Sequence, residues 1–273
     1  MKLRPGLVAS VTGAASGIGR ALAIDLSRRG CNLALCDIDE IGLARTADLC
    51  APQSHVTTSV VDVSGRDAVY AWAEQSVVEH DGMNLLINNA GVNLVDFVET
   101  QTVSDFEWVI DTNLWGVVHG TQAFLPHLKA SGNGHIVNIS SVFGLMSIPS
   151  QSAYNAAKFA VRGYTDALRM ELELEGAPVS ATTIHPGGIK TNIARNGRAR
   201  NYEHSVERFD QIALTSPEKA ARQILTAVER DRRRALVGPD AKLFDLASRL
   251  PAALSQRVTK SVARRSMPPE SHS

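Results

Sequence analysis

Four residues along the chain have side chains that could together move a proton: Asn113, Ser141, Tyr154 and Lys158. Tyr154 and Lys158 are four positions apart in the segment YNAAK, so on a helix their side chains share one face. A tyrosine with the ordinary pKa of about 10 is a poor base at neutral pH, but a nearby positive charge such as an ammonium favours the phenolate. We therefore expect Tyr154 to be a general acid/base and Lys158 to lower its pKa.

The other two residues have supporting roles in this hypothesis. Ser141 ends an apolar run 13 residues before Tyr154, and its hydroxyl could bind the substrate oxygen and stabilise the charge that develops there. Asn113, in the segment DTNLWG, could hold a water that links Lys158 to solvent as a proton relay. Taken singly, both have an ordinary structural explanation, since Asn often caps or bends helices and Ser often ends strands.

A glycine-rich loop precedes these residues. An apolar run over residues 7–11 is interrupted at Gly13, Gly17 and Gly19, after which apolar residues recur at helical spacing. Glycines permit the tight turn and let a pyrophosphate approach the helix N-terminus, whose free N–H groups bind anions. One such loop is also explained by an ordinary turn, but its combination with the four residues above predicts a dinucleotide site. The positive nicotinamide of an oxidised cofactor would favour the Tyr154 phenolate further, and Lys158 could donate to the nicotinamide ribose hydroxyls.

Asp37 ends the next apolar run, about 20 residues beyond the glycines, where a carboxylate can accept hydrogen bonds from both adenosine ribose hydroxyls. A 2′-phosphate would meet a like charge there, and Ser16 stands before Gly17 where a basic residue would offset it. The sequence predicts NAD, with NADP disfavoured; the alternative for Asp37 is a solvated residue at a strand end. Three basic residues lie nearby: Arg20, Arg28 and Arg29.

Strand-like runs alternate with helical segments along the chain. This alternation favours an α/β Rossmann fold in one domain, a doubly wound parallel seven-stranded sheet with helices on both faces. Ligands of such sheets bind beyond the carboxyl ends of the strands. The expected strands are 8–12, 32–37, 55–63, 84–91, 134–141, 179–187 and 234–239. Within one domain, 1–273, we expect a cofactor half (about 5–140), a catalytic and substrate half (about 141–240), a polar lid (192–216) and a C-terminal helical extension (241–273).

Composition limits the function classes. Lys plus Arg and Asp plus Glu are balanced at 28 each, so the net charge gives no case for nucleic-acid binding. Cys31, Cys36 and Cys50 lack metal-binding spacing, and we interpret them as buried thiols in a reducing cytosol. The first residues do not resemble a signal peptide, and no apolar stretch approaches 18 residues. We therefore expect a cytoplasmic protein with no transmembrane segment.

The motifs, in this order, closely resemble those of the short-chain dehydrogenase/reductase family, over about residues 5–240. The resemblance rests on TGAASGIG (12–19), Asp37, Asp62-Val63, NNAG (88–91), PGGIKT (186–191) and the four residues first named. It implies hydride transfer between C4 of the nicotinamide and a carbinol or carbonyl carbon, without a metal. The cofactor-binding residues it implies are Gly13, Ser16, Gly17, Ile18, Gly19, Asp37, Asp62, Val63, Asn89, Ala90, Gly91, Tyr154, Lys158, Pro186, Gly187, Ile189 and Thr191.

Particular roles follow from the same resemblance. It places the adenine against Asp62 and Val63, and the nicotinamide carboxamide against Ile189 and Thr191. Two other enzyme classes fit less well. A serine hydrolase lacks its GxSxG elbow here, and an ATP-binding P-loop lacks the Lys and Ser/Thr that should follow Gly19.

Segments 92–97 and 142–149, which would form the substrate walls, are largely apolar. They indicate a secondary alcohol or ketone of lipid, steroid or terpenoid type, unless these side chains pack the core or a subunit interface. A 3-hydroxyacyl-CoA could instead use four lid arginines, although a solvated lid explains these more simply. A silent dinucleotide-sensing protein and a lyase or epimerase remain further alternatives. The four arginines are Arg195, Arg198, Arg200 and Arg208.

The C-terminal extension and the assembly leave further alternatives open. Residues 242–265 hold six basic residues and one acid among apolar positions at near-helical spacing, so a helix in weak peripheral contact with an anionic membrane is one hypothesis. Packing on the domain or on a second subunit is the other, because Pro251 interrupts the pattern. We expect the tail from 252 to 273 to be frayed. The family resemblance implies a homodimer or homotetramer formed through the helices that carry Asn113 and Tyr154.

Overall fold

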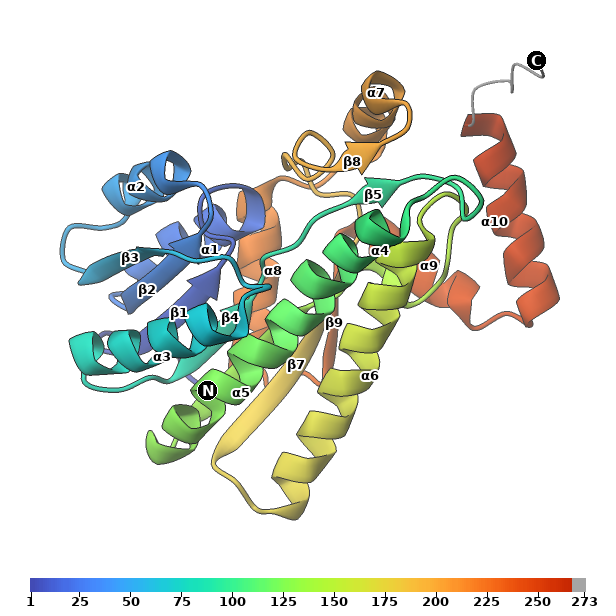
Figure 1. Cartoon of the computed structure of the whole chain (residues 1–273). Helices are drawn as coiled ribbons and strands as arrows, with labels where there is room; N and C mark the ends of the chain where they lie inside the picture. Colours follow the sequence, from blue (N-terminus) through green and yellow to red (C-terminus); the bar gives the residue numbers. More distant parts are fainter. Residues whose placement is uncertain (267–273) are drawn as a thin grey trace.

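A seven-stranded parallel sheet forms the centre of the computed structural model, which describes residues 1–266 (Figure 1). The strand order is β3-β2-β1-β4-β6-β7-β9. The chain adds strands to one side of β1 and then crosses to add the others, so the topological switch point lies between β1 and β4. The strands are β1 (Val8–Thr12), β2 (Asn32–Asp37), β3 (Val56–Val60), β4 (Leu85–Asn88), β6 (Gly134–Ile139), β7 (Val179–Pro186) and β9 (Arg234–Val237).

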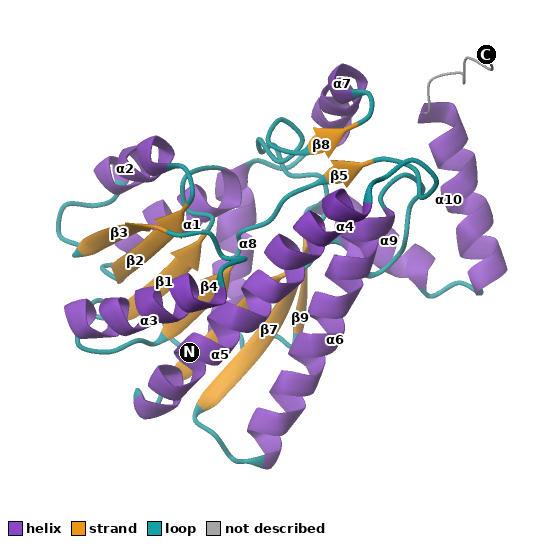
Figure 2. Cartoon of the chain, viewed as in Figure 1, coloured by secondary structure: helices purple, strands orange, loops and turns teal. Residues whose placement is uncertain are grey.

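Helices cover both faces of this sheet (Figure 2). Alternate strand residues point to opposite faces, so Leu85 and Ile87 join the cluster under α1 and α8, whereas Leu86 joins the cluster under α3, α5 and α6. Strands buried on both faces read as continuous apolar runs, which explains why periodicity located them. The helices are α1 (Gly17–Arg28), α2 (Glu40–Leu49), α3 (Arg66–His80), α4 (Val103–Ile110), α5 (Gly116–Ala130), α6 (Ser152–Leu174), α7 (Tyr202–Ile212), α8 (Pro217–Glu229), α9 (Pro239–Ser248) and α10 (Ala252–Ser266), with a π-helix η1 (Asp111–Trp115) and a 3₁₀ turn η2 (Val142–Gly144).

The predicted fold class is confirmed. Two of the predicted strands are markedly longer than the observed ones, and hydrogen bonds explain where one of them ends. Residues 55–63 and 84–91 were expected to be strands, but β3 stops at Val60 and β4 at Asn88. At the end of β4 the backbone turns away, because the Thr12 hydroxyl accepts hydrogen bonds from the N–H groups of Asn89 and Ala90. The turn places the residues after β4 over the carboxyl end of β1.

The segment expected to be a lid has structure of its own. Residues 198–199 form a short strand, β8 (Arg198–Ala199), that pairs in parallel with β5 (Leu94–Val95), and α7 follows it. Figure 1 shows β5, β8 and α7 above the carboxyl ends of the main strands. The lid is therefore tied to the segment after β4 through backbone hydrogen bonds, which the polar sequence did not indicate.

The C-terminal extension is two helices, α9 and α10, separated at Pro251 as the sequence predicted. Helix α9 packs on η2, where Phe244 meets the ring of Phe143 edge to face at a centroid distance of 5.9 Å. The expected fraying is wrong for residues 252–266, which form α10; residues 267–273 lie outside the described part of the chain. Within residues 1–266, no helix is both long and apolar enough to cross a bilayer.

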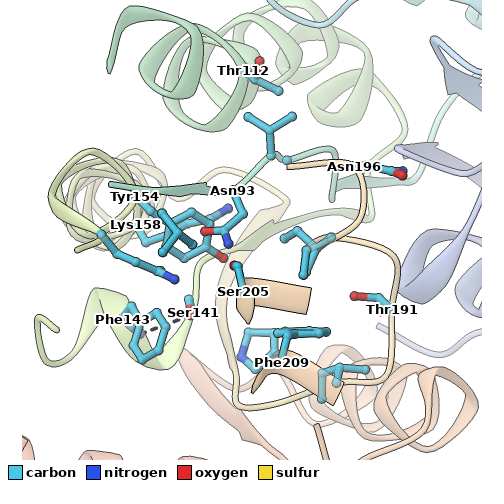
Figure 3. A pocket seen from close by; sticks show the side chains of 18 of the residues that line it. Asn93, Thr112, Ser141, Phe143, Tyr154, Lys158, Thr191, Asn196, Ser205 and Phe209 are labelled. Atoms are coloured by element: carbon cyan, nitrogen blue, oxygen red, sulfur yellow. Dashed lines mark hydrogen bonds between the residues drawn. The ribbon is translucent and has the colours of Figure 1, made fainter. Parts of the chain in front are cut away.

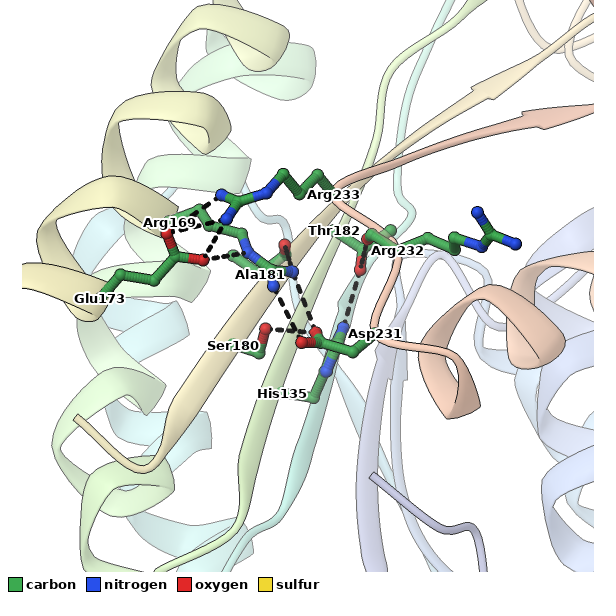
Figure 4. Close-up of polar contacts among 9 residues, drawn as sticks. All are labelled: His135, Arg169, Glu173, Ser180, Ala181, Thr182, Asp231, Arg232 and Arg233. Carbon is green, nitrogen blue, oxygen red and sulfur yellow. Dashed lines mark hydrogen bonds and ion pairs between the residues drawn. The ribbon is translucent and has the colours of Figure 1, made fainter. Parts of the chain in front are cut away.

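An ion-pair network secures the sheet at its end away from the carboxyl edge (Figure 4). Arg169 of α6 donates two hydrogen bonds of 2.8 and 2.9 Å to the Asp231 carboxylate and one of 3.0 Å to the carbonyl of Ala181. The guanidinium is nearly buried and the Asp231 carboxylate is about half exposed, and their two parallel hydrogen bonds join α6 to the loop before β9. The bond to Ala181 joins α6 to β7. The network keeps α6, which carries Tyr154 and Lys158, against the sheet.

Candidate active site

A cleft of about 1890 Å³ runs along the carboxyl edge of the sheet. Among the residues predicted to bind cofactor or substrate, the structure brings together 17 side chains or backbone positions in its walls. Two predicted residues lie outside the lining, Gly19 and Asn113, and both are packed directly behind it. The lining residues are Gly13, Ser16, Gly17, Ile18, Asp37, Asp62, Val63, Asn89, Ala90, Gly91, Ser141, Tyr154, Lys158, Pro186, Gly187, Ile189 and Thr191.

The glycine loop needs its glycines for reasons that the structure makes explicit. Gly13 and Gly17 have φ angles of 67° and 54°, in the left-handed region that favours glycine. A Cβ on Gly13 would lie 2.8 Å from the Cα of Ala90, and one on Gly19 would collide with the carbonyl oxygen of Gly13. Gly19 thus acts from behind the cleft by letting α1 pack against the loop.

The N-terminus of α1 offers unpaired donors to the cleft. The first turn of a helix has no intrahelical partners for its N–H groups, and the N-cap Ser16 provides no side-chain hydrogen bond to them. Asp37 lies opposite, and its carboxylate accepts the Ala15 N–H at 2.9 Å while remaining in the cleft wall. Donors for a pyrophosphate and a carboxylate for a ribose are therefore both present, so these residues fit a dinucleotide.

The three arginines near Asp37 have different surroundings. Arg20 extends under α2, where it donates to the Thr46 hydroxyl at 2.9 Å and to two backbone carbonyls. Arg29 pairs with Asp25 at 2.7 Å and with Glu229 at 3.3 Å. Neither of these arginines lines the cleft, and Arg28 does not line it either.

The turn after β7 is seated against the start of α9. Gly188 donates its N–H to the Asp240 carboxylate at 2.7 Å, and a Cβ on Gly187 would collide with the same carboxylate. Thr191 lies against Gly17 of the glycine loop, 3.0 Å from the Cβ position there. Asp240 therefore fixes the turn after β7 in the wall of the cleft, a role that no motif in the sequence indicated.

Tyr154 and Lys158 occupy successive turns of α6, as their spacing predicted. The Lys158 Nζ lies over the Tyr154 ring, 5.5 Å from its centroid, and donates to the carbonyl oxygen of Ile139 at 3.0 Å. Both side chains are buried, with exposed fractions of 8% for Tyr154 and 3% for Lys158. The phenol and the amine are thus close together with little access to water.

Burial shifts the pKa values of the Tyr154 phenol and the Lys158 amine in opposite directions. It raises the pKa of Tyr154 to about 12, with a smaller opposing effect from the Ser141 hydrogen bond. It lowers the pKa of Lys158 to about 8, because desolvation disfavours the ammonium. In the ligand-free protein desolvation therefore determines the direction of both shifts; the expected lowering of the Tyr154 pKa by Lys158 together with an oxidised nicotinamide stays a prediction.

Ser141 is held in place from two sides. Its hydroxyl accepts the N–H of Phe143 at 3.1 Å, as shown in Figure 3, and its carbonyl accepts a hydrogen bond from His185 Nδ1 at 2.8 Å. Burial lowers the pKa of His185 to about 4, so the imidazole is neutral at pH 7. His185 was not predicted; its position inside the sixth predicted strand (179–187), just before the Pro-Gly turn, was the available signal.

Asn113 lies in the π-helix η1, a distortion that is frequent at functional sites. Its side chain is committed, because Oδ1 accepts the Val92 N–H at 2.8 Å and Nδ2 donates to the Val92 carbonyl at 2.9 Å. A Cβ added to Gly91 would lie 2.9 Å from the Asn113 Oδ1 atom and 3.5 Å from Lys158 Nζ, so the three residues are close together. The side chain of Asn113 therefore fixes the chain after β4, and the expected water would have to bind elsewhere on this residue.

Comparison with known proteins agrees with this geometry. A model of the short chain dehydrogenase family matches residues 7–201. The chain belongs to the short-chain dehydrogenase family. It is 48% identical over 258 residues to a putative oxidoreductase, SadH, of Mycobacterium tuberculosis, covering 93% of this chain and 94% of that protein.

Solved structures of the family are also similar to this short-chain dehydrogenase. A short-chain dehydrogenase/reductase from Burkholderia phymatum in complex with NAD is 30% identical, covers both chains completely and superposes with a TM-score of 0.84. Levodione reductase is 28% identical, with a TM-score of 0.78 over 88% of this chain and 98% of that one.

Both segments predicted to form substrate walls line the cleft of this short-chain dehydrogenase, and so does the segment expected to be a lid. The C-terminal extension adds Phe244, Leu243 and Ala247 of α9 and Thr259 of α10, which the sequence did not assign to the site. The wall residues from the two predicted segments are Val92, Asn93, Val95, Asp96, Phe97, Val142, Phe143, Met146, Ile148 and Pro149.

The four lid arginines separate into two pairs. Arg198 stacks on Trp108 at 4.0 Å from the ring centroid and pairs with Asp105 at 2.6 Å, and Arg195 pairs with Asp210 at 2.6 Å. These contacts hold the lid on α4 and on itself. The other pair, Arg200 and Arg208, lines the cleft.

Proposed function

We propose that this protein is an NAD-dependent oxidoreductase that interconverts a hydrophobic secondary alcohol and its ketone, with Tyr154 as the general acid/base. The observation that carries the proposal is the shared cleft: the phenol of Tyr154, the amine of Lys158 and the free N–H groups of α1 all line it. A protein that merely sensed a dinucleotide would not need a buried phenol and amine together.

Tyr154, Ser141 and Lys158 each have a distinct role in the proposed reaction. Bound NAD would supply the hydride acceptor, C4 of the nicotinamide, for the carbinol carbon, and the positive charge of the ring would favour the phenolate of Tyr154. Tyr154 takes the proton of the alcohol during oxidation and returns it during ketone reduction. Ser141 donates a hydrogen bond to the substrate oxygen, and the N–H of Phe143 keeps its hydroxyl in position. Lys158 holds the ribose and supplies charge near the phenol.

The choice of NAD rests on Asp37. A 2′-phosphate at this position would lie against a carboxylate, and the neighbouring Arg20 and Arg29 are engaged with other partners. The solved Burkholderia relative that superposes best among those described here contains NAD. An NADP-dependent activity would need one of these arginines to leave its contacts.

The substrate end supports an apolar alcohol or ketone. Its walls combine Phe97, Phe143, Met146 and Phe244 around Tyr154, which suits a bulky hydrocarbon skeleton. A 3-hydroxyacyl-CoA is less favoured, because Arg195 and Arg198, two of the four arginines that could bind its phosphates, already pair with carboxylates.

We also propose a cytoplasmic, oligomeric protein. Cys31, Cys36 and Cys50 are free thiols, as a reducing compartment favours; two are buried and Cys50 is partly exposed. The helices expected to form the subunit interface carry exposed apolar side chains, which suits a homodimer or homotetramer. These side chains are Trp115, Phe159, Met170 and Leu174.

The decisive experiment replaces Tyr154 by Phe. A screen of secondary alcohols with NAD and NADP, followed by NADH absorbance, should find activity in the wild type and none in Tyr154→Phe, while NADH binding by fluorescence stays unchanged. A fully active variant would remove Tyr154 from the mechanism. Release of free NADH during turnover would exclude a lyase or epimerase, which regenerates its cofactor.

A further inference from the structure

Asn93 is a polar side chain buried in the cleft wall without a partner. Its exposed fraction is 8%, and its carboxamide forms no hydrogen bond with any residue of the described chain, 1–266. Three buried asparagines nearby, Asn88, Asn113 and Asn138, have bonded side chains. Asn192 and Asn196 also line the cleft, but both are exposed. Asn93 differs from the first group in its unbonded carboxamide and from the second in its burial.

The backbone around Asn93 is held on both sides. On one side, Val92 exchanges two hydrogen bonds with the Asn113 side chain. On the other, the Asn93 carbonyl accepts the N–H of Arg198 at 2.9 Å, where the lid strand β8 begins. A side chain on Gly197 would crowd this contact, since its Cβ would lie 2.7 Å from the same carbonyl. Because these contacts fix the backbone of Asn93, its side chain cannot leave the cleft wall by a movement of the main chain alone.

The position of Asn93 places it beside the reacting groups. Its neighbours Val92 and Leu94 pack in the same apolar cluster as Tyr154. A Cβ added to Gly91, two residues before Asn93, would lie 3.5 Å from Lys158 Nζ. Figure 3 shows the Asn93 carboxamide extending into the same part of the cleft as the Tyr154 ring. The surrounding wall is mainly apolar, so Asn93 is one of the few polar groups able to orient a ligand there.

Asn93 lines the cleft, and its carboxamide has a donor and an acceptor that no residue within the described range 1–266 uses, so an oxygen atom of a ligand can bond to it. We infer that Asn93 binds a second oxygen atom of the substrate, a hydroxyl or carbonyl on a carbon next to the reacting one. This inference rests on the function proposed above and narrows it to vicinal diols and the corresponding hydroxy ketones on an apolar skeleton. Nδ2 donates to a carbonyl or hydroxyl oxygen, and Oδ1 accepts from a hydroxyl, so one side chain serves both redox states.

The first test compares 1-indanol with indane-1,2-diol, which differ by a single hydroxyl. The wild type should have a kcat/KM for the diol roughly tenfold or more above that for 1-indanol, and Asn93→Leu should abolish this ratio. Asn133→Leu, at an exposed loop position, is the matched control and should retain the ratio. Equal kcat/KM values for the two alcohols in the wild type would overturn the inference.

A conservative variant separates hydrogen bonding from packing. Asn93→Asp keeps an acceptor and loses the Nδ2 donor, so it should retain a preference for the diol in oxidation. In reduction, it should lose any preference for indane-1,2-dione over 1-indanone, because a carbonyl oxygen needs a donor. The melting temperature of ligand-free Asn93→Leu should not fall, since the amide has no partner to lose. A large fall would assign Asn93 a structural role and overturn the inference.

Binding to an inactive enzyme distinguishes this inference from the proposed reaction. In Tyr154→Phe saturated with NAD, calorimetry should show the diol binding roughly tenfold more tightly than 1-indanol, and the difference should vanish when Asn93→Leu is added. If wild type oxidises neither alcohol but this difference is present, the reaction is wrong and the oxygen subsite stands. If both alcohols are oxidised but bind equally, the subsite is wrong and the reaction stands. If neither alcohol binds, the subsite is also wrong.

Discussion

Lys158 lies over the ring of Tyr154, with its Nζ 5.5 Å from the centroid and bonded to the Ile139 carbonyl. The amine therefore approaches the face of the phenol while its hydrogen bond is directed to the sheet. Desolvation raises the pKa of Tyr154 to about 12 and lowers that of Lys158 to about 8. At pH 7 the phenol is therefore neutral and the amine is still mostly protonated, so Lys158 places a positive charge beside a neutral ring.

The pH dependence of alcohol oxidation should follow the ionisation of the Tyr154 phenol. Because burial raises the pKa of Tyr154 to about 12 and Tyr154 must be deprotonated to accept a proton, kcat/KM for alcohol oxidation should rise with pH in the alkaline range. Ser141→Ala removes a hydrogen bond that lowers this pKa, so it should move the profile to higher pH. Ser140→Ala is the control, since its hydroxyl bonds the Lys158 backbone carbonyl. Coincident profiles for wild type and Ser141→Ala would contradict this account.

Cofactor selection should depend on Asp37. Asp37→Ala should weaken NAD binding by roughly 10- to 100-fold, the effect of losing hydrogen bonds to a charged group, and should improve the relative affinity for NADP. Fluorescence titration with NADH and NADPH measures both. Asp48→Ala, an exposed position on α2, should change neither affinity. An unaltered preference in Asp37→Ala would place the ribose elsewhere.

The C-terminal extension should affect large substrates selectively. Phe244→Ala removes the ring that meets Phe143, so kcat/KM for a bulky apolar alcohol should fall roughly tenfold while NADH affinity is kept. Leu246→Ala on the same helix is the control, because that side chain is 64% exposed. Equal losses in the two variants would mean that α9 stabilises the fold without shaping the pocket.

Acid should destabilise the protein through two buried histidines. Burial lowers the pKa values of His135 and His185 to about 4, from 6.5 in an unfolded chain. Between these values the unfolded chain binds protons that the native state does not, so the free energy of unfolding must fall as the pH drops from about 6.5 to 4. Each histidine can contribute roughly 3 kcal/mol to this fall.

A single variant checks the assignment. His135 lies in the network of Figure 4, where its Nε2 lies 2.9 Å from the Thr182 hydroxyl. Urea denaturation of His135→Gln between pH 7 and 4.5 should show a shallower decline in the free energy of unfolding than the wild type does. Parallel declines would show that His135 has no part in the acid sensitivity.

The local features of this protein could be predicted from its sequence. Buried parallel strands are continuous apolar runs, the glycine turn needs residues without a Cβ, and four residues on a helix bring Tyr154 and Lys158 to one face. These properties depend on neighbours along the chain. That is why the seven strands and the break at Pro251 could be located without coordinates, and why most of the predicted site residues lie in the lining of one cleft.

The tertiary structure decided what depends on contacts between distant segments. The Asn113 side chain bonds Val92 instead of remaining available for a water, the extension brings Phe244 to the substrate end, and Asn93 is left without a partner. Desolvation also sets the pKa of Tyr154, and it arises from every element packed around the ring. Burial and hydrogen-bond pairing are properties of the assembled fold, so residue type and spacing alone do not determine them.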